Sequence, residues 1–108
     1  EGQDLGITLR ASEIPILPEA LQFASMGLFP AGAYNNKEFR SCMVDFGSEV
    51  DSILADLLFD PQTSGGLLIS VSSTHAEALL EDLHSHGIKD ASMIGEVLPG
   101  PPGKIVVV

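Results

Sequence analysis

The 108-residue sequence is poor in cysteine and in basic side chains, and it contains no long apolar run. The single cysteine, Cys42, excludes a disulfide within the chain and favours a reducing compartment. No uninterrupted apolar stretch approaches the roughly 18 residues that a membrane-spanning helix needs. From these absences we expect a soluble, cytoplasmic protein that does not span a membrane.

Basic residues are outnumbered by acidic ones. Five Lys and Arg residues stand against fifteen Asp and Glu residues, which gives a formal net charge of −10 at pH 7. A surface of this sign repels nucleic-acid phosphates and anionic lipids. We therefore expect neither nucleic acid nor a membrane as a partner, and solubility is a sufficient explanation of the acidity.

Residues that commonly form catalytic or metal sites are also scarce. Cys42 has no histidine placed to activate it, and a lone cysteine is more often a small packing residue than a nucleophile. His84 and His86 are two positions apart and point to different faces of a predicted helix, which is poor geometry for a shared metal. The sequence thus predicts no catalytic residue and no metal ligand in this chain.

Length and composition predict one globular domain. The chain is 44% hydrophobic with a mean hydropathy of +0.27, which is typical of a packed core, and 108 residues leave no room for a second core. The sequence does not begin with Met, and its first residues lack the basic region and apolar core of a signal peptide. We expect the chain to begin within a longer protein.

The spacing of apolar residues predicts both strands and helices. Strands are predicted where apolar and polar residues alternate or β-branched residues cluster, at residues 5–14, 43–46, 66–71, 92–97 and 104–108. Helices are predicted where apolar residues recur every three or four positions, at residues 18–26, 48–58 and 73–86. This order predicts an α+β domain with a mixed β-sheet covered by helices.

Particular residues are expected to delimit these elements. Gly27 and Gly87 should end the first and third helices, and Ser48 should cap the second. Residues 27–36 are predicted to form an ordered loop, and the last two strands should pair as an antiparallel hairpin. The residues expected to face the core are Leu21, Ala24 and Leu28 in and after the first helix, and Ala76, Leu79, Leu80 and Leu83 in the third.

The most informative stretch is the polar segment 60–66, Asp-Pro-Gln-Thr-Ser-Gly-Gly, which separates two apolar runs. Pro61 fixes its own φ, and the two glycines can take positive φ, so the chain should turn sharply here. Its carboxylate, amide and hydroxyl groups exceed what a turn needs. The candidate ligand-facing residues are Asp60, Gln62, Thr63, Ser64, Gly65 and Gly66. The alternative is a plain turn, because Asp-Pro and Gly-Gly are common turn sequences.

The run from Asp60 to Leu68 resembles the signature in the C-terminal half of the selenide, water dikinases, the selenophosphate synthetase family. Further matches in the same order extend the resemblance over nearly the whole chain, at Ile14-Pro15, Leu17-Pro18, residues 27–30, Gly32, Asn36 and residues 94–97. The resemblance marks Gly32 and Asn36 as a second candidate loop. It departs at Asn35, where many family members have a basic residue, so no phosphate contact is assigned to that position.

This resemblance implies a fold and an activity. The family is similar to aminoimidazole ribonucleotide synthetase, whose C-terminal domain contains a mixed sheet, and residues 1–108 would be the C-terminal domain of a two-domain enzyme. The whole enzyme would be a homodimer that converts selenide, ATP and water to selenophosphate, AMP and phosphate. Mg²⁺ and ATP would bind mainly to the N-terminal half, so no tightly bound cofactor is expected here. That N-terminal domain would be the partner of this chain, which would be inactive alone.

Two other functions stay open from the sequence. The chain could belong to a related ATP-dependent synthetase or kinase that acts on a phosphorylated ribonucleotide or a thiamine precursor, although the sequence of segment 60–66 argues against this assignment. It could also be a noncatalytic binding or dimerisation module.

Overall fold

The computed structural model describes residues 4–108, which form a mixed four-stranded sheet and four α-helices. The strands are β1 (Gly6–Leu9), β2 (Val44–Phe46), β3 (Gly95–Leu98) and β4 (Ile105–Val107). The helices are α1 (Pro18–Ser25), α2 (Ala31–Arg40), α3 (Ser52–Leu57) and α4 (Ser73–Ser85), with short 3₁₀ turns at Ala11–Glu13 and Ser41–Met43. The predicted α+β class is confirmed.

The sheet has the strand order β2-β4-β1-β3. Strand β4 pairs in parallel with both β1 and β2, whereas β1 and β3 pair antiparallel, with Ile7 opposite Ile105 on one side and Val97 on the other. Val107, near the end of β4, is only 1% exposed and is the most deeply buried large side chain among the described residues. The sheet is therefore centred on the β4–β1 pair.

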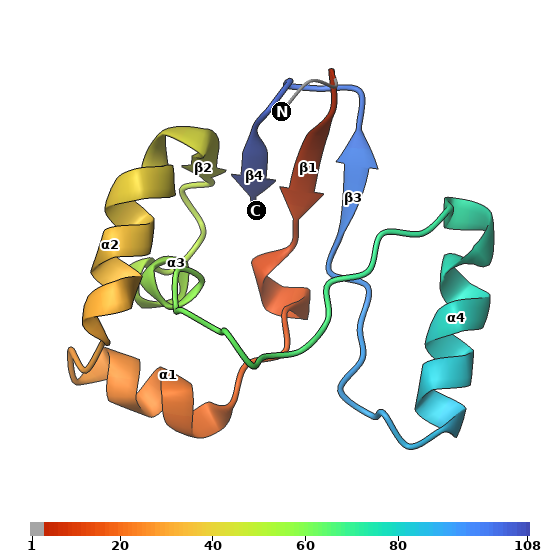
Figure 1. Cartoon of the computed structure of the whole chain (residues 1–108), viewed down its shortest axis with the longest axis horizontal. Helices are drawn as coiled ribbons and strands as arrows, with labels where there is room; N and C mark the ends of the chain where they lie inside the picture. The colour runs from red at the N-terminus through yellow and green to blue at the C-terminus, as the bar shows by residue number, and fades with distance from the viewer. Residues whose placement is uncertain (1–3) are drawn as a thin grey trace.

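The predicted hairpin between the last two strands is wrong, because β1 lies between β3 and β4 (Figure 1). Their connection passes over the start of β1: the Gly103 amide donates to the Leu5 carbonyl at 2.9 Å, and a Cβ at Gly6 would lie 2.5 Å from the Pro101 carbonyl oxygen. Six connecting residues are long enough to cross one strand. Turn residues alone did not reveal this crossing.

The N-terminal strand is shorter than predicted. It ends at Leu9, and the chain then turns through a 3₁₀ segment in which Ala11 is buried at 7% exposure. Prediction of a short strand at 43–46 is confirmed by β2. Alternation of apolar and polar residues continues past Leu9 in the sequence. The amides of Arg10 and Ala11 still donate to the carbonyls of Ile94 and Val108, at 2.7 and 2.8 Å, but the chain then turns into the 3₁₀ segment.

Residues 31–36 are helical, so the predicted loop over residues 27–36 is wrong in its second half. Helix α2 follows directly after Pro30, whose φ of −67° and extended ψ suit the residue that precedes a helix. Ala33 is 4% exposed and fixes the buried side of α2. The sequence of α2 has few apolar residues at helical spacing, so periodicity gave no helical signal, and Asn36 lies inside the helix rather than in a loop.

The other helices agree better with the sequence. Helix α1 ends as predicted, with Gly27 at a φ of +76°, and Gly87 follows α4 at a φ of +87°. Helix α3 is shorter than predicted, and its cap is Asp51 rather than Ser48. The Asp51 carboxylate accepts hydrogen bonds from the amides of Ile53 and Leu54, at 2.8 and 3.2 Å. The Asp51 carboxylate, one residue before the helix, therefore accepts the amide hydrogen bonds that the sequence suggested for the Ser48 hydroxyl.

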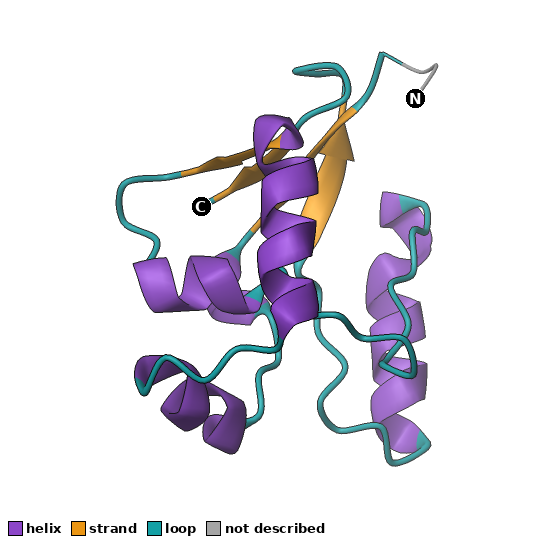
Figure 2. Cartoon of the chain, turned by 60° about the vertical axis from the view of Figure 1, so that its left-hand side comes forward, coloured by secondary structure: helices purple, strands orange, loops and turns teal. Residues whose placement is uncertain are grey.

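Helices α1, α2 and α3 pack together on the β2 side of the sheet, whereas α4 stands beyond β3 (Figure 1). When the left-hand side of Figure 1 is turned toward the viewer, α2 passes in front of the strands (Figure 2). Of the α1 residues expected to face the core, only Ala24 is buried; Leu21 is 45% exposed, and Leu28 beyond the helix is 58% exposed. The predicted stripe of α4 is half-buried at Ala76, Leu79, Leu80 and Leu83.

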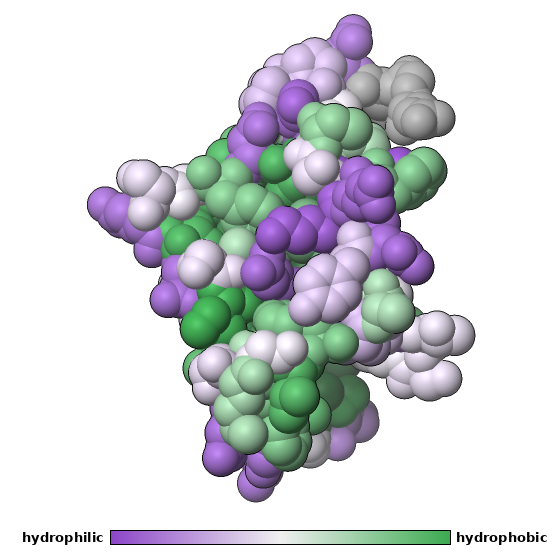
Figure 3. Space-filling view, turned by 90° about the vertical axis from the view of Figure 1, so that its left-hand side faces the viewer, coloured by the Kyte–Doolittle hydropathy of each residue, from purple (hydrophilic) through white to green (hydrophobic). Residues whose placement is uncertain are grey.

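The face that carries α1 has many apolar side chains at its surface. Figure 3 shows them gathered toward the lower end of the molecule, where α1 lies. The exposed residues of this group include Leu17, Phe23 and Met26. Monomeric soluble proteins rarely leave such side chains contiguous at the surface, so this end of the molecule is suited to contact with further protein.

Candidate functional site

The polar segment 60–66 leaves the end of α3 and begins the connection that crosses the molecule to α4 (Figure 1). Phe59 anchors its start. This side chain is 8% exposed and makes an edge-to-face contact with Phe46 of β2, with ring centroids 6.0 Å apart and planes inclined by 65°. The segment therefore starts from a packed aromatic pair and then moves out to the surface.

Helix α2 holds the beginning of the segment. The Asn36 side-chain amide donates a hydrogen bond to the Phe59 carbonyl at 2.9 Å. One turn earlier on α2, a Cβ at Gly32 would lie 3.0 Å from Cγ of Pro61, so the absence of a side chain at Gly32 permits this close approach. The two residues predicted to form a second loop thus lie on a helix, and the structure brings both to the first candidate segment.

Inside the segment the chain makes a tight turn. The Asp60 amide donates to the Leu57 carbonyl at 3.0 Å, and the Gly65 amide donates to the Gln62 carbonyl at 3.1 Å. A Cβ at Gly65 would lie 3.0 Å from Oε1 of Gln62, whereas a Cβ at Gly66 would have open space. Neither Gly65 nor Gly66 has a positive φ, so the expectation that glycine supplies a left-handed conformation here is wrong. Gly65 instead leaves room for the Gln62 side chain.

Three polar side chains of the segment face solvent. Gln62, Thr63 and Ser64 are exposed, and within the part of the chain that the structure describes, their side chains make no hydrogen bond to another residue. Asp60 is half-buried. An amide and two hydroxyls can donate to phosphate or carbonyl oxygens of a ligand, or to another protein surface. The segment is thus equipped to bind through hydrogen bonds.

The surroundings of the segment supply little positive charge. Lys37 on α2, one residue after Asn36, forms an ion pair with Asp56 of α3. Phosphoryl groups are usually bound by metal ions and cationic side chains, which neutralise their charge. Hydrogen-bond donors without a free cation can position a phosphate but do not neutralise it, so the charge would have to be neutralised by groups outside this segment.

The residues considered for metal or nucleophile chemistry do not gather at this segment. Among residues 4–108, no group of three or more His, Cys, Asp or Glu side chains is arranged to hold a metal ion. Cys42 is exposed, and His84 hydrogen-bonds through Nε2 to the Ala91 carbonyl at 2.8 Å. His86 lies near the Asp82 carboxylate at 3.7 Å on the exposed side of α4. No shared site of the two histidines forms in the described chain.

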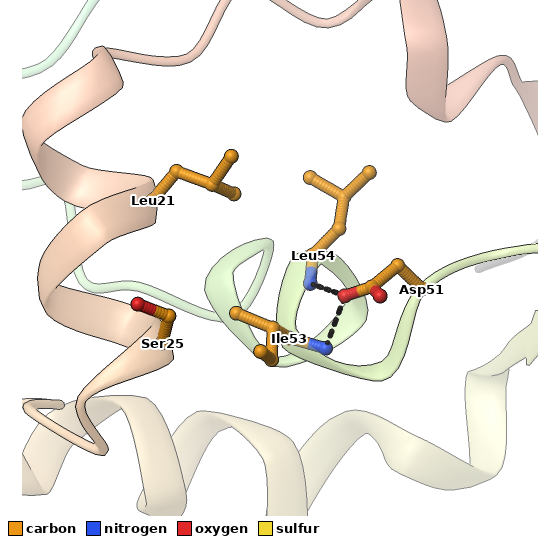
Figure 4. Close-up of a pocket in the computed structure, with 5 residues that line it drawn as sticks. All are labelled: Leu21, Ser25, Asp51, Ile53 and Leu54. Carbon is orange, nitrogen blue, oxygen red and sulfur yellow. Dashed lines mark hydrogen bonds between the residues drawn. The ribbon is translucent and has the colours of Figure 1, made fainter.

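A hollow that the sequence did not indicate lies between α1 and α3 and has a volume of about 320 Å³. Figure 4 shows its lining residues, Leu21, Ser25, Asp51, Ile53 and Leu54. The carboxylate of Asp51 already caps α3, and most of the other lining is apolar. This hollow therefore offers a packing surface and little chemistry.

The described helices do not include one that is both long and apolar enough to cross a membrane. The family model "AIR synthase related protein, C-terminal domain" matches residues 1–108, and the chain belongs to this family.

The chain is also similar to curated proteins named selenide, water dikinase. The chain is 52% identical over 102 residues to a selenide, water dikinase of Pelobacter propionicus, which covers 94% of the chain and 29% of that relative. It is 38% identical over 99 residues to a selenide, water dikinase of Clostridioides difficile, covering 92% of the chain and 28% of the relative. For selenide, water dikinase 2 of Peptoclostridium acidaminophilum the identity is 44% over 105 residues, covering 95% of the chain and 30% of the relative.

The chain thus spans less than a third of the length of these curated relatives.

Proposed function

We propose that this chain is the C-terminal domain of a two-domain selenide, water dikinase, which forms selenophosphate, AMP and phosphate from selenide, ATP and water. The observation that carries the proposal is the 52% identity over 102 residues to a relative with that name. This identity extends over 94% of the chain, which supports the activity of that relative over the activities of other enzymes with the same fold. The enzyme would be cytoplasmic and homodimeric, with no nucleic acid or membrane as a partner.

Within that enzyme, the segment Asp60 to Gly66 would face the substrate cleft. Its exposed side chains, Gln62, Thr63 and Ser64, make no hydrogen bond to other described residues, and helix α2 fixes the backbone from which they project. They would position a phosphate group or a water molecule through hydrogen bonds. No catalytic residue is assigned to the chain itself.

Mg²⁺ and ATP would be bound mainly by the other domain. Bound Mg²⁺ would supply the charge neutralisation that phosphoryl transfer needs. Lys37 near the segment is paired with Asp56, so the charge of a phosphate at the segment would be neutralised by groups of the other domain. The isolated chain would therefore be inactive, and its direct partner would be the N-terminal domain of the same protein.

The test is selenide-dependent formation of AMP by the longer protein that contains this chain. We expect AMP and phosphate to appear from ATP only when selenide is present. An ATPase activity that depends instead on a phosphorylated ribonucleotide or a thiamine precursor would assign the chain to a related synthetase and would refute the proposal. Absence of any ATP turnover in a folded longer protein would favour a noncatalytic module.

A further inference from the structure

The segment Gly66–Val71, which directly follows the candidate site, is the most exposed apolar stretch of the described chain. We call it the apolar segment. Leu67 is 89% exposed, Leu68 78%, Ile69 52% and Val71 43%. The sequence predicts a strand here, but the segment belongs to no strand of the sheet, so that prediction is wrong for this chain. Four large apolar side chains within five positions are costly to leave in water.

The backbone of the apolar segment is also unpaired within the described part of the chain. The hydrogen-bonded turn before it ends at the Gly65 amide, and the next backbone bond after it joins the His75 amide to the Ser72 carbonyl at 2.9 Å. Between these two bonds, the backbone groups of residues 66–71 form no hydrogen bond to another backbone group among residues 4–108. Ile69 and Val71 are β-branched and favour an extended conformation. Side chains and backbone together are those of a strand that lacks its neighbour.

Two kinds of neighbour could supply the missing partner, a second copy of this chain or the rest of the same protein. The relatives favour the second, because more than two thirds of the length of each lies outside the region that matches this chain. The apolar segment also continues directly from segment 60–66, which faces another domain if the proposed function holds. One surface of the longer protein can then cover both.

We propose that, in the longer protein, Gly66–Val71 is a β-strand that pairs with and is covered by a segment of the same polypeptide outside these 108 residues. This inference rests on the proposed function only in taking the chain as part of a longer protein. Strand geometry would place Leu67, Ile69 and Val71 on one face and Leu68 with Ser70 on the other. The backbone pairing holds residues 60–65 at the rim of the contact.

The first experiment identifies the partner directly. A photoreactive phenylalanine analogue replaces Leu67 in the longer protein, and the cross-linked peptides are mapped by mass spectrometry. We expect adducts with peptides outside residues 1–108, formed within one molecule when isotopically heavy and light proteins are mixed. Adducts within residues 1–108, or mixed heavy-light adducts that reveal a second copy, would overturn the proposal. The same analogue at Ala78, on the exposed side of α4, is the control and should give no such adduct.

The second experiment uses the unmodified longer protein, so that it does not depend on tolerance of the analogue. Amide hydrogen exchange at residues 67–71 should be slowed by on the order of 100-fold or more relative to unstructured peptide. The slowing should not change on dilution. Fast exchange, or protection that disappears on dilution, would overturn the proposal. Leu67→Asp should remove the protection, and Ala78→Asp, which adds the same charge to α4, should keep it.

The outcomes that test the apolar segment are distinct from the outcomes that test the proposed function. A protein with the expected cross-links and protection but no selenide-dependent AMP formation would keep the strand contact and refute the activity. A protein that makes selenophosphate but shows no contact at Leu67 would support the activity and refute the strand contact.

Discussion

The side-chain amide of Asn36 and the main-chain carbonyl of Phe59 are joined by a hydrogen bond of 2.9 Å, although 23 residues separate them in the chain. This bond connects the middle of α2 to the residue from which the candidate segment starts. Gly32, one turn earlier, allows Pro61 to lie against the same helix. The position of segment 60–66 is therefore set by α2 as well as by its own turn.

Replacing Asn36 by alanine should loosen the start of the segment. The Phe59 carbonyl would lose its donor in a half-buried position, which costs about 1 kcal/mol of unfolding free energy. Urea denaturation measures this loss, and amide exchange of residues 60–66 should become faster. Asn35→Ala, at the neighbouring exposed position of α2, is the matched control: it makes the same change in helix propensity but keeps the bond to Phe59, so it should be about 1 kcal/mol more stable than Asn36→Ala. Equal effects of both substitutions would contradict the role given to Asn36.

Gly32 and Pro61 should behave as a coupled pair. Alanine is favoured over glycine in helices by up to about 1 kcal/mol, but a Cβ at Gly32 meets the ring of Pro61. Gly32→Ala should therefore destabilise the chain when Pro61 is present and become neutral or stabilising when Pro61→Ala removes the ring. A double-mutant cycle by urea denaturation should give a coupling of about 1 kcal/mol. Additive effects would show that α2 and the segment are not in contact.

Asp51 should contribute more to stability than Ser48. Its carboxylate accepts two backbone amide hydrogen bonds at the start of α3, and replacing such a cap by alanine typically costs about 1 kcal/mol. Thermal unfolding of Asp51→Ala should show this loss, while Asp51→Asn should retain most of the stability. Ser48→Ala tests the cap that the sequence suggested. A larger loss for Ser48→Ala would mean that α3 begins earlier than the structure has it.

The isolated chain should not bind nucleotide. Segment 60–66 offers hydrogen-bond donors, and Lys37, on the helix that holds the segment, is already paired with Asp56. Calorimetric titration with magnesium ATP and with AMP should give no binding heat for the isolated chain and clear binding for the longer protein. Binding by the isolated chain would place nucleotide recognition in this domain, and segment 60–66 would be the first place to look for it.

The sequence predicted the fold best where a local signal was strong. Gly27 and Gly87 end their helices, and the spacing around Ala76 and Leu80 marks the half-buried side of α4. It failed where contacts distant in sequence decide the structure. Pairing of β1 between β3 and β4 depends on the passage of the 99–104 connection over Gly6, which no turn sequence encodes.

The sequence suggested the candidate segment 60–66, whose role stays a prediction, but it did not suggest the internal geometry of that segment. Residue types at 60–66 indicated a polar turn, and the resemblance added Gly32 and Asn36. That these two residues hold Phe59 and Pro61 from a helix could not be predicted, because the helix itself had no apolar periodicity to reveal it. The strand predicted at 66–71 is wrong for the described chain, because this segment pairs with no strand among residues 4–108.

The measurement that tests the central claim most directly is the turnover of the Thr63→Ala, Ser64→Ala double variant of the longer protein in selenide-dependent AMP formation. Both hydroxyls are exposed and make no hydrogen bond to other described residues, so the thermal stability should not change. If they position a substrate group, kcat should fall by about tenfold or more. Ser85→Ala, at the far end of α4, is the control and should keep full activity. Unchanged turnover in a stably folded double variant would reduce segment 60–66 to a turn and contradict its place in the substrate cleft.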